Sequence, residues 1–360
     1  MQTNFVEECK KIYSLLGDEE SKDIFLNRIL LSITEDWNYA RYIVENYLDG
    51  YGKNEIFIGI EDCLEQLNLT KEKKYVIYGA GMFGAQAYRY LKNQNIKVMA
   101  FCDTNISKQK EDYCGLSVLS PDEIVKNNSL QILLAVWEQS ENIKEFLLGK
   151  GISEDRIIDC FTVKSYTDKS QYFDQDIIHW TNDEVFVDCG CYDFETPEIF
   201  VKKCPNYHKV YCFEPDHTNY INIVDKVTKE SFHNVEVLPY GVWNTNETLC
   251  FGGNGSSAKI DEMGKESIDV VSIDETIHDS VTFIKMDIEG SELKALEGAK
   301  NIIIKNKPKL AISVYHRPED IISIPLYIES LVSGYKLYLR HYSNYFATET
   351  VLYAIHEGNK

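Results

Sequence analysis

The sequence predicts an α/β protein that contains two tandem Rossmann-like domains. Twice along the chain, a strand leads into a turn that contains glycine, and a helix and a second strand follow. In both cases the second strand ends in a carboxylate, as in a mononucleotide-binding α/β unit. The first unit spans residues 74–103 and the second spans residues 185–214. A further apolar run, Leu130–Trp137, is typical of a strand buried in the centre of a sheet.

The chain is long enough for two domains with separate cores, and its pattern divides it into four parts. We expect a helical N-terminal segment at residues 1–70 that acts as a cap or as an oligomerisation element, which leaves a homodimer open. A Rossmann-like domain follows at 71–160, a polar, non-periodic linker at 161–180, and the second domain at 181–360. The helical pattern rests on apolar residues that recur at three- and four-residue steps: Ile29, Ile33, Trp37, Ala40, Val44 and Tyr47.

Charge and cysteine content exclude several classes of protein. The formal net charge of −20 would repel a phosphate backbone, so nucleic acid is not expected as a partner, and anionic membrane surfaces are disfavoured for the same reason. The first residues lack the basic start and apolar core of a signal peptide, and no apolar run is long enough to span a membrane. Ten cysteines without an export signal suggest reduced thiols. We therefore expect a cytoplasmic protein.

The first glycine motif has the context of a nucleotide-binding turn. Gly79, Gly81 and Gly84 follow a strand and open a helix, where glycine permits a tight turn and close approach to phosphate. Asp103 ends the next strand, at the position of a ribose-binding carboxylate. We expect a nucleotide or nucleotide sugar here. The alternative is a degenerate domain that is retained for packing or dimerisation.

The order of elements after this motif carries a first resemblance. Ser120-Pro121-Asp122-Glu123 has the residues of a helix start, with serine as N-cap, proline at the first position and glutamate at the third. With the glycine turn, Asp103 and the strand that follows, this part resembles the N-terminal nucleotide-sugar-binding domains of PglD-like sugar acyltransferases.

The second glycine turn is acidic, which bears on its ligand. Beside Gly190, the turn carries Asp188 and Asp193 instead of the run of glycines of a dinucleotide-binding turn. A pyrophosphate would meet negative charge there, whereas a cationic nucleoside without phosphate, such as S-adenosylmethionine, would not. Gly190 permits close approach to the backbone, Asp188 would counter the ammonium group of the donor, and Glu214 would accept the ribose hydroxyls. The electrostatics favour a methyl donor over NAD.

Several motifs of the second domain resemble the FkbM-type S-adenosylmethionine-dependent methyltransferases, over roughly residues 180–356. The resemblance implies a class I methyltransferase fold with a mostly parallel sheet and an antiparallel last strand, and it implies O-methylation. It places Asp188, Gly190, Tyr192, Asp193, Glu214 and Asp287 at the donor. The sequence departs from the pattern at Phe194, where such turns usually carry another glycine. The motifs are FVDCGCYDFET (186–196), FEPD (213–216), FIKMDIEG (283–290), KPKLAISVYHRPED (307–320), YKLYLRHYS (335–343) and ETVLYAI (349–355).

The candidates for the acceptor side are Asp287, Glu289, His316 and Arg340. His316 is the expected general base, since the unperturbed pKa of histidine lies near neutral pH. Asp287 would orient that base, bind the donor, or bind Mg²⁺ or Mn²⁺ together with Glu289. Glu289 is equally explained as a charge at a helix N-terminus. Arg340 would steer an anionic or hydroxyl-rich acceptor, or form an ion pair with a neighbouring carboxylate.

Two other features are explained without a catalytic or metal-binding role. Lys285 alternates with apolar strand residues and is interpreted as part of a solvated face. Cys189 and Cys191 flank Gly190, but no second cysteine pair with zinc spacing accompanies them, so we expect small buried side chains and no metal site of this kind.

The function predicted from these observations is an S-adenosylmethionine-dependent O-methyltransferase that acts on a sugar hydroxyl in glycan or nucleotide-sugar metabolism. A nucleotide sugar at the first domain is a second expected ligand. The first alternative is a non-catalytic nucleotide-sugar-binding scaffold of a polysaccharide pathway, in which Phe194 marks a donor site that no longer closes. The second alternative is an NAD(P)-dependent sugar oxidoreductase, which is disfavoured because no catalytic Tyr–Lys pair follows the first glycine motif.

Overall fold

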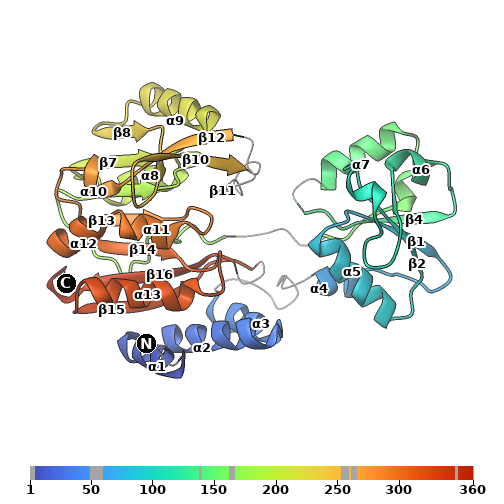
Figure 1. Ribbon diagram of the computed structural model, residues 1–360, viewed down its shortest axis with the longest axis horizontal. Helices are drawn as coiled ribbons and strands as arrows, with labels where there is room; N and C mark the ends of the chain where they lie inside the picture. Colours follow the sequence, from blue (N-terminus) through green and yellow to red (C-terminus); the bar gives the residue numbers. More distant parts are fainter. Residues whose placement is uncertain are drawn as a thin grey trace. The chain divides into compact units, whose positions relative to one another are not determined.

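The computed structural model of the protein divides into two compact units (Figure 1). Unit 1 comprises Met1–Asp49, Thr167–Ser343 and Ala347–Lys360, and unit 2 comprises Gly50–Tyr166 and Asn344–Phe346. The residues whose structure is described are 5–48, 60–137, 140–161, 167–252, 259–260, 266–344 and 348–359. None of the helices in these ranges combines the length and the apolar character that a membrane span requires.

Unit 2 is a parallel α/β domain around a five-stranded sheet of order β3-β2-β1-β4-β5. All four of its strand pairs are parallel, as predicted from the alternation of strands and helices. The predicted capping box is present at Ser120, whose backbone N–H donates to Glu123 (2.8 Å). In chain order the elements are α4 (Ile60–Gln66), β1 (Lys74–Tyr78), α5 (Met82–Asn93), β2 (Val98–Cys102), η1 (Lys108–Lys110), β3 (Val118–Leu119), α6 (Pro121–Val125), β4 (Leu130–Leu134), α7 (Ser140–Gly149), η2 (Glu154–Arg156) and β5 (Ile157–Asp159).

Unit 1 is built on a seven-stranded sheet of order β15-β16-β14-β13-β6-β7-β8. Strands β14, β13, β6, β7 and β8 are parallel to one another, while β16 runs antiparallel to both β14 and β15. The predicted mostly parallel sheet with an antiparallel last strand is therefore confirmed. The strands are β6 (Val185–Cys189), β7 (Lys209–Phe213), β8 (Val235–Leu238), β13 (Phe283–Met286), β14 (Lys309–Ser313), β15 (Tyr335–His341) and β16 (Thr350–His356).

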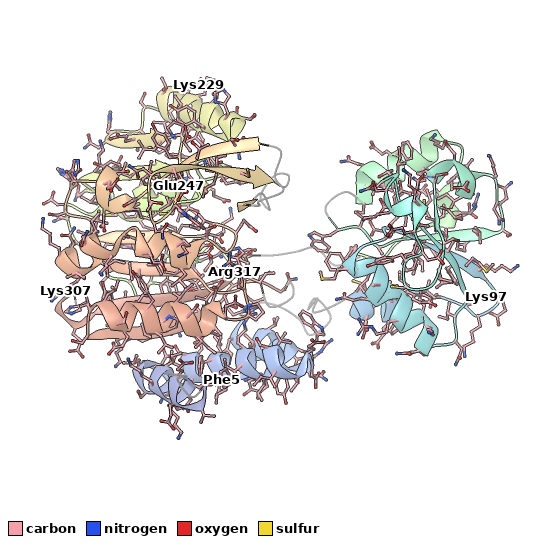
Figure 2. The ribbon with its side chains drawn as sticks, in the orientation of Figure 1. Phe5, Lys97, Lys229, Glu247, Lys307 and Arg317 are labelled. Carbon is pink, nitrogen blue, oxygen red and sulfur yellow. The ribbon has the colours of Figure 1, made fainter. Side chains whose placement is uncertain are left out.

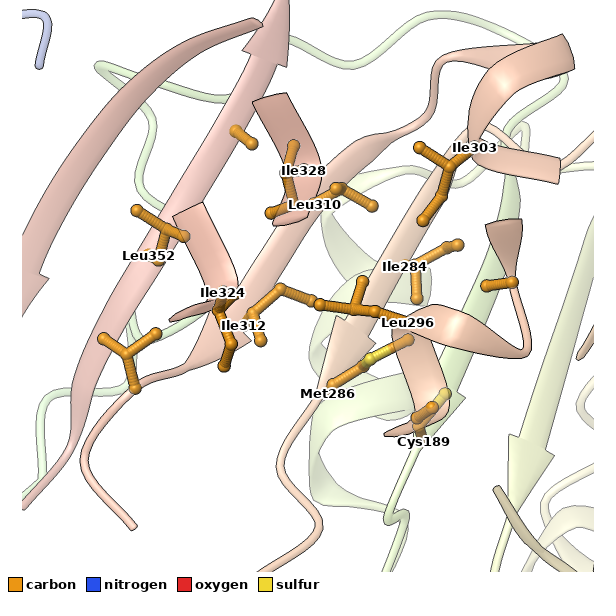
Figure 3. Packing of buried hydrophobic residues seen from close by; sticks show 14 of the residues in the cluster. Cys189, Ile284, Met286, Leu296, Ile303, Leu310, Ile312, Ile324, Ile328 and Leu352 are labelled. Atoms are coloured by element: carbon orange, nitrogen blue, oxygen red, sulfur yellow. The ribbon is translucent and has the colours of Figure 1, made fainter. Parts of the chain in front are cut away.

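Apolar side chains cover both faces of this sheet. On one face, Ile324 and Ile328 of α13 pack with Leu310 and Ile312 of β14 (Figure 3). The other face is mainly aromatic, and the rings of Phe186 and Phe283 stack with centroids 4.8 Å apart. The helices are α8 (Glu195–Lys203), α9 (His217–Lys229), α10 (Ile273–Thr276), α11 (Glu292–Glu297), α12 (Lys300–Asn306), α13 (Asp320–Leu331) and the short η4 (Glu357–Asn359).

A second, four-stranded sheet of unit 1 has the order β11-β10-β12-β9. Its strands are β9 (Gly241–Val242), β10 (Glu247–Gly252), β11 (Lys259–Ile260) and β12 (Glu266–Val271). Strand β10 pairs antiparallel with β11 and β12, and β9 pairs parallel with β12.

The N-terminal helices α1 (Phe5–Leu15), α2 (Glu19–Thr34) and α3 (Asn38–Tyr47) lie along the edge strand β15 (Figure 1). The Gly17 N–H donates to the carbonyl of Leu337 (2.8 Å), and the Leu339 N–H donates to the hydroxyl of Ser21 (3.0 Å). These bonds occupy backbone groups that an edge strand would otherwise leave open for another strand. The helices thus complete unit 1. The expected helical segment at 1–70 is shared between the units, because α4 packs on α5 in unit 2.

Arg340 of β15 fixes α2 in this position. Its Nη2 atom lies 2.7 Å from Asp18, and its Nε atom lies 3.5 Å from Glu20 and 3.4 Å from Asp174. The side chain of Arg340 is 13% exposed, so these ion pairs are shielded from solvent. Of the two roles open from the sequence, the structure thus shows the ion pair with neighbouring carboxylates.

Replacing Arg340 with methionine should lower the free energy of unfolding of the full chain by ~2–3 kcal/mol, since hydrogen bonds to charged groups are lost. Three carboxylates would also be left without their cation. The change is measured by urea unfolding. Lys229→Met is the matched control, because its pair with Asp225 is exposed, and it should change stability by at most ~0.5 kcal/mol. Equal effects in the two variants would contradict the assignment of Arg340 as a structural residue.

Candidate active site

Four of the candidate residues lie at the carboxyl edge of the unit 1 sheet, where its parallel strands end. Figure 2 shows Lys307 and Arg317 at opposite ends of β14, so Arg317 marks the edge at which the parallel strands end. Asp188 lies at the end of β6, and Glu214, Asp287 and His316 lie in the turns after β7, β13 and β14. In open α/β sheets this edge is where ligands bind.

Gly190 allows two of these turns to approach each other closely. Its φ angle is +86°, and a Cβ atom at this position would lie 2.2 Å from the carbonyl oxygen of Asp287. Any side chain would push the turn after β6 away from the turn after β13. The first role of Gly190 is therefore to place Asp287, which the sequence analysis did not anticipate.

The rest of this turn holds two residues in the left-handed conformation. Tyr192 has φ +54° and is exposed, whereas Phe194 has φ +73° and is buried. The ring of Phe194 packs edge-on against Phe232 (5.0 Å between centroids), so apolar burial offsets the backbone cost of a non-glycine residue. Asp193 accepts a hydrogen bond from the Glu195 N–H (2.9 Å) and thereby caps the start of α8.

Glu214 is held in a fixed orientation by backbone donors. The Tyr192 N–H donates to its Oε2 atom (2.8 Å), and the Asp216 N–H donates to its Oε1 atom (2.9 Å). Burial raises the pKa of Glu214, although these hydrogen bonds oppose the shift. A carboxylate oxygen can accept two hydrogen bonds; the side-chain amide of Asn219 also lies 3.5 Å from Oε1, and Oε2 keeps acceptor capacity for a ligand hydroxyl.

Asp188 and Lys285 form a buried ion pair between the adjacent strands β6 and β13. Their charged atoms lie 3.0 Å apart, and both side chains are at most 3% exposed. Lys285 also donates a hydrogen bond to the carbonyl of Gly190 (2.8 Å). Burial raises the pKa of Asp188 to about 6, and Lys285 opposes this shift. The prediction that Lys285 lies on a solvated face was wrong, because its charge is compensated inside the sheet. The carboxylate of Asp188 is therefore paired with Lys285.

Asp287 is the centre of a hydrogen-bond network that includes residues not singled out from the sequence. The hydroxyl of Tyr172 donates to its Oδ2 atom (2.8 Å), and the hydroxyl of Tyr315 donates to its Oδ1 atom (3.2 Å). The Tyr315 hydroxyl also lies 3.3 Å from Glu349, so it connects the two carboxylates. Tyr172 further contacts the hydroxyl of Ser313 (3.3 Å).

Glu349 also belongs to this network, but its pKa is raised, whereas the pKa of Asp287 is lowered. Burial and the neighbouring charge of Asp287 raise the pKa of Glu349 to about 7. The side chain of Gln171 donates to its Oε2 atom. Sequence signals for these residues existed but were not specific: Tyr172 lies in the expected linker, and Glu349 opens the ETVLYAI motif.

His316 is surrounded by three carboxylates. Its Nε2 atom lies 3.4 Å from Asp287 and 3.6 Å from Glu289, and its Nδ1 atom lies 2.9 Å from Glu292. Burial opposes a charge on the imidazole, but the carboxylates outweigh it and raise the pKa of His316 to about 11. At neutral pH the ring is therefore protonated. This environment disfavours the predicted role of His316 as a general base.

The structure thus brings Asp287, Glu289 and His316 together and keeps Arg340 apart from them, on β15 with the N-terminal helices. Gly190 lies directly against the backbone of Asp287. In the same turn, the Tyr192 N–H donates a hydrogen bond to Glu214, which connects Glu214 to this group of residues.

The glycine motif of unit 2 forms a tight turn between β1 and α5. A Cβ atom at Gly84 would lie 2.0 Å from the carbonyl oxygen of Gly79, whose φ angle is +110°. Gly81 has open space on its Cβ side. Asp103 accepts hydrogen bonds from the Ala80 N–H and from Lys108 (both 3.0 Å), so its carboxylate closes the glycine turn.

Comparison with family models identifies two segments of the chain. Residues 188–337 match the methyltransferase FkbM domain. This match spans the strand ends described above and supports a S-adenosylmethionine-dependent methyltransferase. Residues 71–158 match a C2185-like N-terminal domain, so the resemblance of this part to PglD-like domains is not confirmed.

Solved structures similar to this chain include several methyltransferases. A methyltransferase FkbM from Methylobacillus flagellatus is 21% identical, with coverage of 90% of this chain and 99% of that chain and a TM-score of 0.49. An rRNA methylase from Streptococcus thermophilus is 15% identical (48% and 86% coverage, TM-score 0.33). Fibrillarin from Aeropyrum pernix with bound S-adenosyl-L-methionine is 9% identical (49% and 67% coverage, TM-score 0.30). A search of curated proteins found no match.

Replacing Asp188 with asparagine should lower the free energy of unfolding by ~3–5 kcal/mol, because Lys285 would remain as an uncompensated buried charge. The double variant Asp188→Leu/Lys285→Met should recover most of this loss. Both are measured by urea unfolding beside Asp225→Asn, which removes one partner of an exposed pair. A cost for Asp188→Asn no larger than that of the control would show that the buried pair does not hold the two strands together.

Proposed function

We propose that the protein is an S-adenosylmethionine-dependent O-methyltransferase that acts on a sugar hydroxyl of a glycan or nucleotide sugar. The observation that carries the proposal is the match of residues 188–337 to the FkbM methyltransferase domain, since this range contains Glu214, Asp287 and His316. The choice of a hydroxyl acceptor is supported by the side chains around Asp287, which are hydroxyl and carboxylate groups suited to polar acceptors.

On the donor side, Glu214 is proposed to accept the ribose hydroxyls of S-adenosylmethionine. Its carboxylate is already oriented by two backbone donors and keeps acceptor capacity. Gly190, Tyr192 and Asp287 are proposed to line the same ligand. Asp188 acts indirectly, because its charge is matched by Lys285, which holds the carbonyl of Gly190. Asp193 is proposed to face the sulfonium side of the donor from the start of α8.

On the acceptor side, the reaction is an in-line displacement. The acceptor oxygen forms a bond to the methyl carbon, the C–S bond breaks with its electron pair left on sulfur, and the hydroxyl proton passes to a base. We assign that base to Glu349, which is partly exposed and linked to Asp287 through the hydroxyl of Tyr315. A pKa of about 7 suits proton transfer at neutral pH, whereas His316 is already protonated.

A nucleotide sugar in unit 2 remains a separate proposal. It is supported by the open space at Gly81, where a ligand can approach the backbone at the start of α5. Because Asp103 is bound to the turn itself, recognition of a ribose by this carboxylate, as in NAD enzymes, would require these bonds to break.

Calorimetric titration of the full chain with S-adenosylhomocysteine tests the donor site without knowledge of the acceptor. We expect micromolar binding, about −8 kcal/mol. Glu214→Gln should weaken binding by ~10–100-fold, because a hydrogen bond to a charged group is worth ~1.5–3 kcal/mol. Gly81→Asp in unit 2 is the control and should bind as the wild type does. No heat and no thermal stabilisation at saturating ligand would rule out the donor site and favour the scaffold alternative.

Methyl transfer from radiolabelled S-adenosylmethionine to a panel of nucleotide sugars and oligosaccharides tests the chemistry. Glu349→Gln should lower kcat by ~10²–10⁴-fold, the usual contribution of a general base, with unchanged affinity for S-adenosylhomocysteine. Asp287→Ala should abolish transfer. The wild-type kcat should rise with pH through about 7, as Glu349 ionises. Full activity of Glu349→Gln would remove it as the base, and transfer to nitrogen or sulfur acceptors alone would contradict O-methylation.

A further inference from the structure

Asp287, Glu292 and His316 form a compact group of metal-ligating side chains at the carboxyl edge of the unit 1 sheet. One potential ligand atom from each residue lies within 4.8 Å of the other two. The three residues come from the turn after β13, the first turn of α11 and the turn after β14. In the part of the chain that the structure describes, this is the one group of at least three such residues.

The group contains buried polar atoms without hydrogen-bond partners. The side chain of His316 is 9% exposed and that of Glu292 is fully buried. Among the described residues, the contacts of the two His316 ring nitrogens with carboxylate oxygens at 2.9–3.6 Å lack hydrogen-bond geometry, and the Oε2 atom of Glu292 has no hydrogen-bond partner. Buried polar atoms in folded proteins are nearly always paired, so these atoms point to a ligand that completes the site.

The charge of the group also calls for a cation. Asp287, Glu289 and Glu292 place three carboxylates around one imidazole. Lys285, the cation below them in β13, is already engaged by Asp188 and by the carbonyl of Gly190. A buried excess of negative charge is costly unless a positive charge compensates it.

The candidate ligands are held in place by a second set of contacts. The Oε1 atom of Glu292 accepts hydrogen bonds from the N–H groups of Ile288 (2.9 Å) and Gly290 (3.4 Å). Asp287 is oriented by the hydroxyl groups of Tyr172 and Tyr315. Such outer contacts commonly fix metal ligands before the metal binds.

We propose that Asp287, Glu292 and His316 bind one divalent first-row transition-metal cation, with Mn²⁺ as the representative ion, which displaces the proton of the His316 imidazole on binding. Ligand atoms ~2.1 Å from a metal lie ~3–4 Å from one another, and the Nε2 atom of His316 and the Oδ1 atom of Asp287 are separated by 3.4 Å. The Glu292 carboxylate belongs to the same group, since one ligand atom of each of the three residues lies within 4.8 Å of the other two. An imidazole nitrogen suits first-row transition metals better than Mg²⁺, which takes oxygen ligands, and the two carboxylates also suit Mn²⁺.

The cation would serve the acceptor side of the site. This role rests on the proposed function, whereas the binding itself rests only on the geometry of the three residues. An acceptor hydroxyl that coordinates the cation loses its proton more easily, and Glu349 receives that proton. The alkoxide then attacks the methyl group of the donor, whose sulfur keeps the electron pair of the broken bond.

The test is titration of the chelator-treated full chain with MnCl₂, followed by calorimetry and by the loss of the free Mn²⁺ signal in electron paramagnetic resonance. We expect one ion per chain. His316→Gln and Glu292→Gln should each weaken binding by at least ~10-fold, the usual effect of a lost contact at such sites. The matched control is His233→Gln, which removes an exposed histidine. In His316→Asp, an all-oxygen ligand set should restore binding and shift the preference towards Mg²⁺.

Absence of Mn²⁺ binding by the wild-type chain, or equal binding by both glutamine variants and the control, would overturn the site. Affinity for S-adenosylhomocysteine serves as the check that each variant is folded. The outcome also separates the two proposals: binding of S-adenosylhomocysteine without Mn²⁺ rejects the cation site alone, and binding of Mn²⁺ without S-adenosylhomocysteine rejects the methyltransferase function alone.

Discussion

The buried ion pair between Asp188 and Lys285 is the interaction on which the geometry of the site depends. It joins β6 to β13 in the centre of the sheet, and Lys285 at the same time holds the carbonyl of Gly190. Gly190 in turn leaves room for the backbone of Asp287 only because it has no side chain. One lysine therefore sets the distance between the turn proposed to hold the donor and the turn proposed to face the acceptor. Removal of either partner would leave the other as an uncompensated charge inside the sheet.

The remaining charges of the site follow from this centre. Lys285 pairs with Asp188 and its charge also lowers the pKa of Asp287, whereas His316 is the positive group that Asp287, Glu289 and Glu292 all contact. The imidazole is thereby held in its charged form, and the role of base falls to a carboxylate whose own pKa is raised. The same shortage of positive charge is what a bound cation would relieve. The predicted base and the proposed metal ligand are thus the same residue, and its neighbours decide between the two roles.

The parts of the structure that could be predicted from the sequence are those that depend on local patterns. The strands before Asp188 and Glu214 were predicted from the local sequence pattern, and their carboxyl ends meet those of the strands before Asp287 and His316 because these strands are parallel. The environment of Lys285 could not be predicted, since alternation along a strand does not show that both faces are covered by helices. Other misses depend on contacts far apart in the sequence. Tyr172 reaches Asp287 from a segment without periodicity, and Arg340 is engaged by helices more than three hundred residues earlier.

Backbone strain indicates that the site is formed before any ligand binds. Several of its non-glycine residues have left-handed backbone conformations, a state that costs ~1–3 kcal/mol each and persists only where surrounding contacts impose it. The contacts are visible: Phe194 is held by an aromatic pocket, Tyr192 by Glu214, and Glu349 by Tyr315 and Gln171. Since folding has already met this cost, a ligand that fits the site need not meet it again, and more of its interaction energy is available for binding. The residues concerned are Tyr172, Tyr192, Phe194, Glu289 and Glu349.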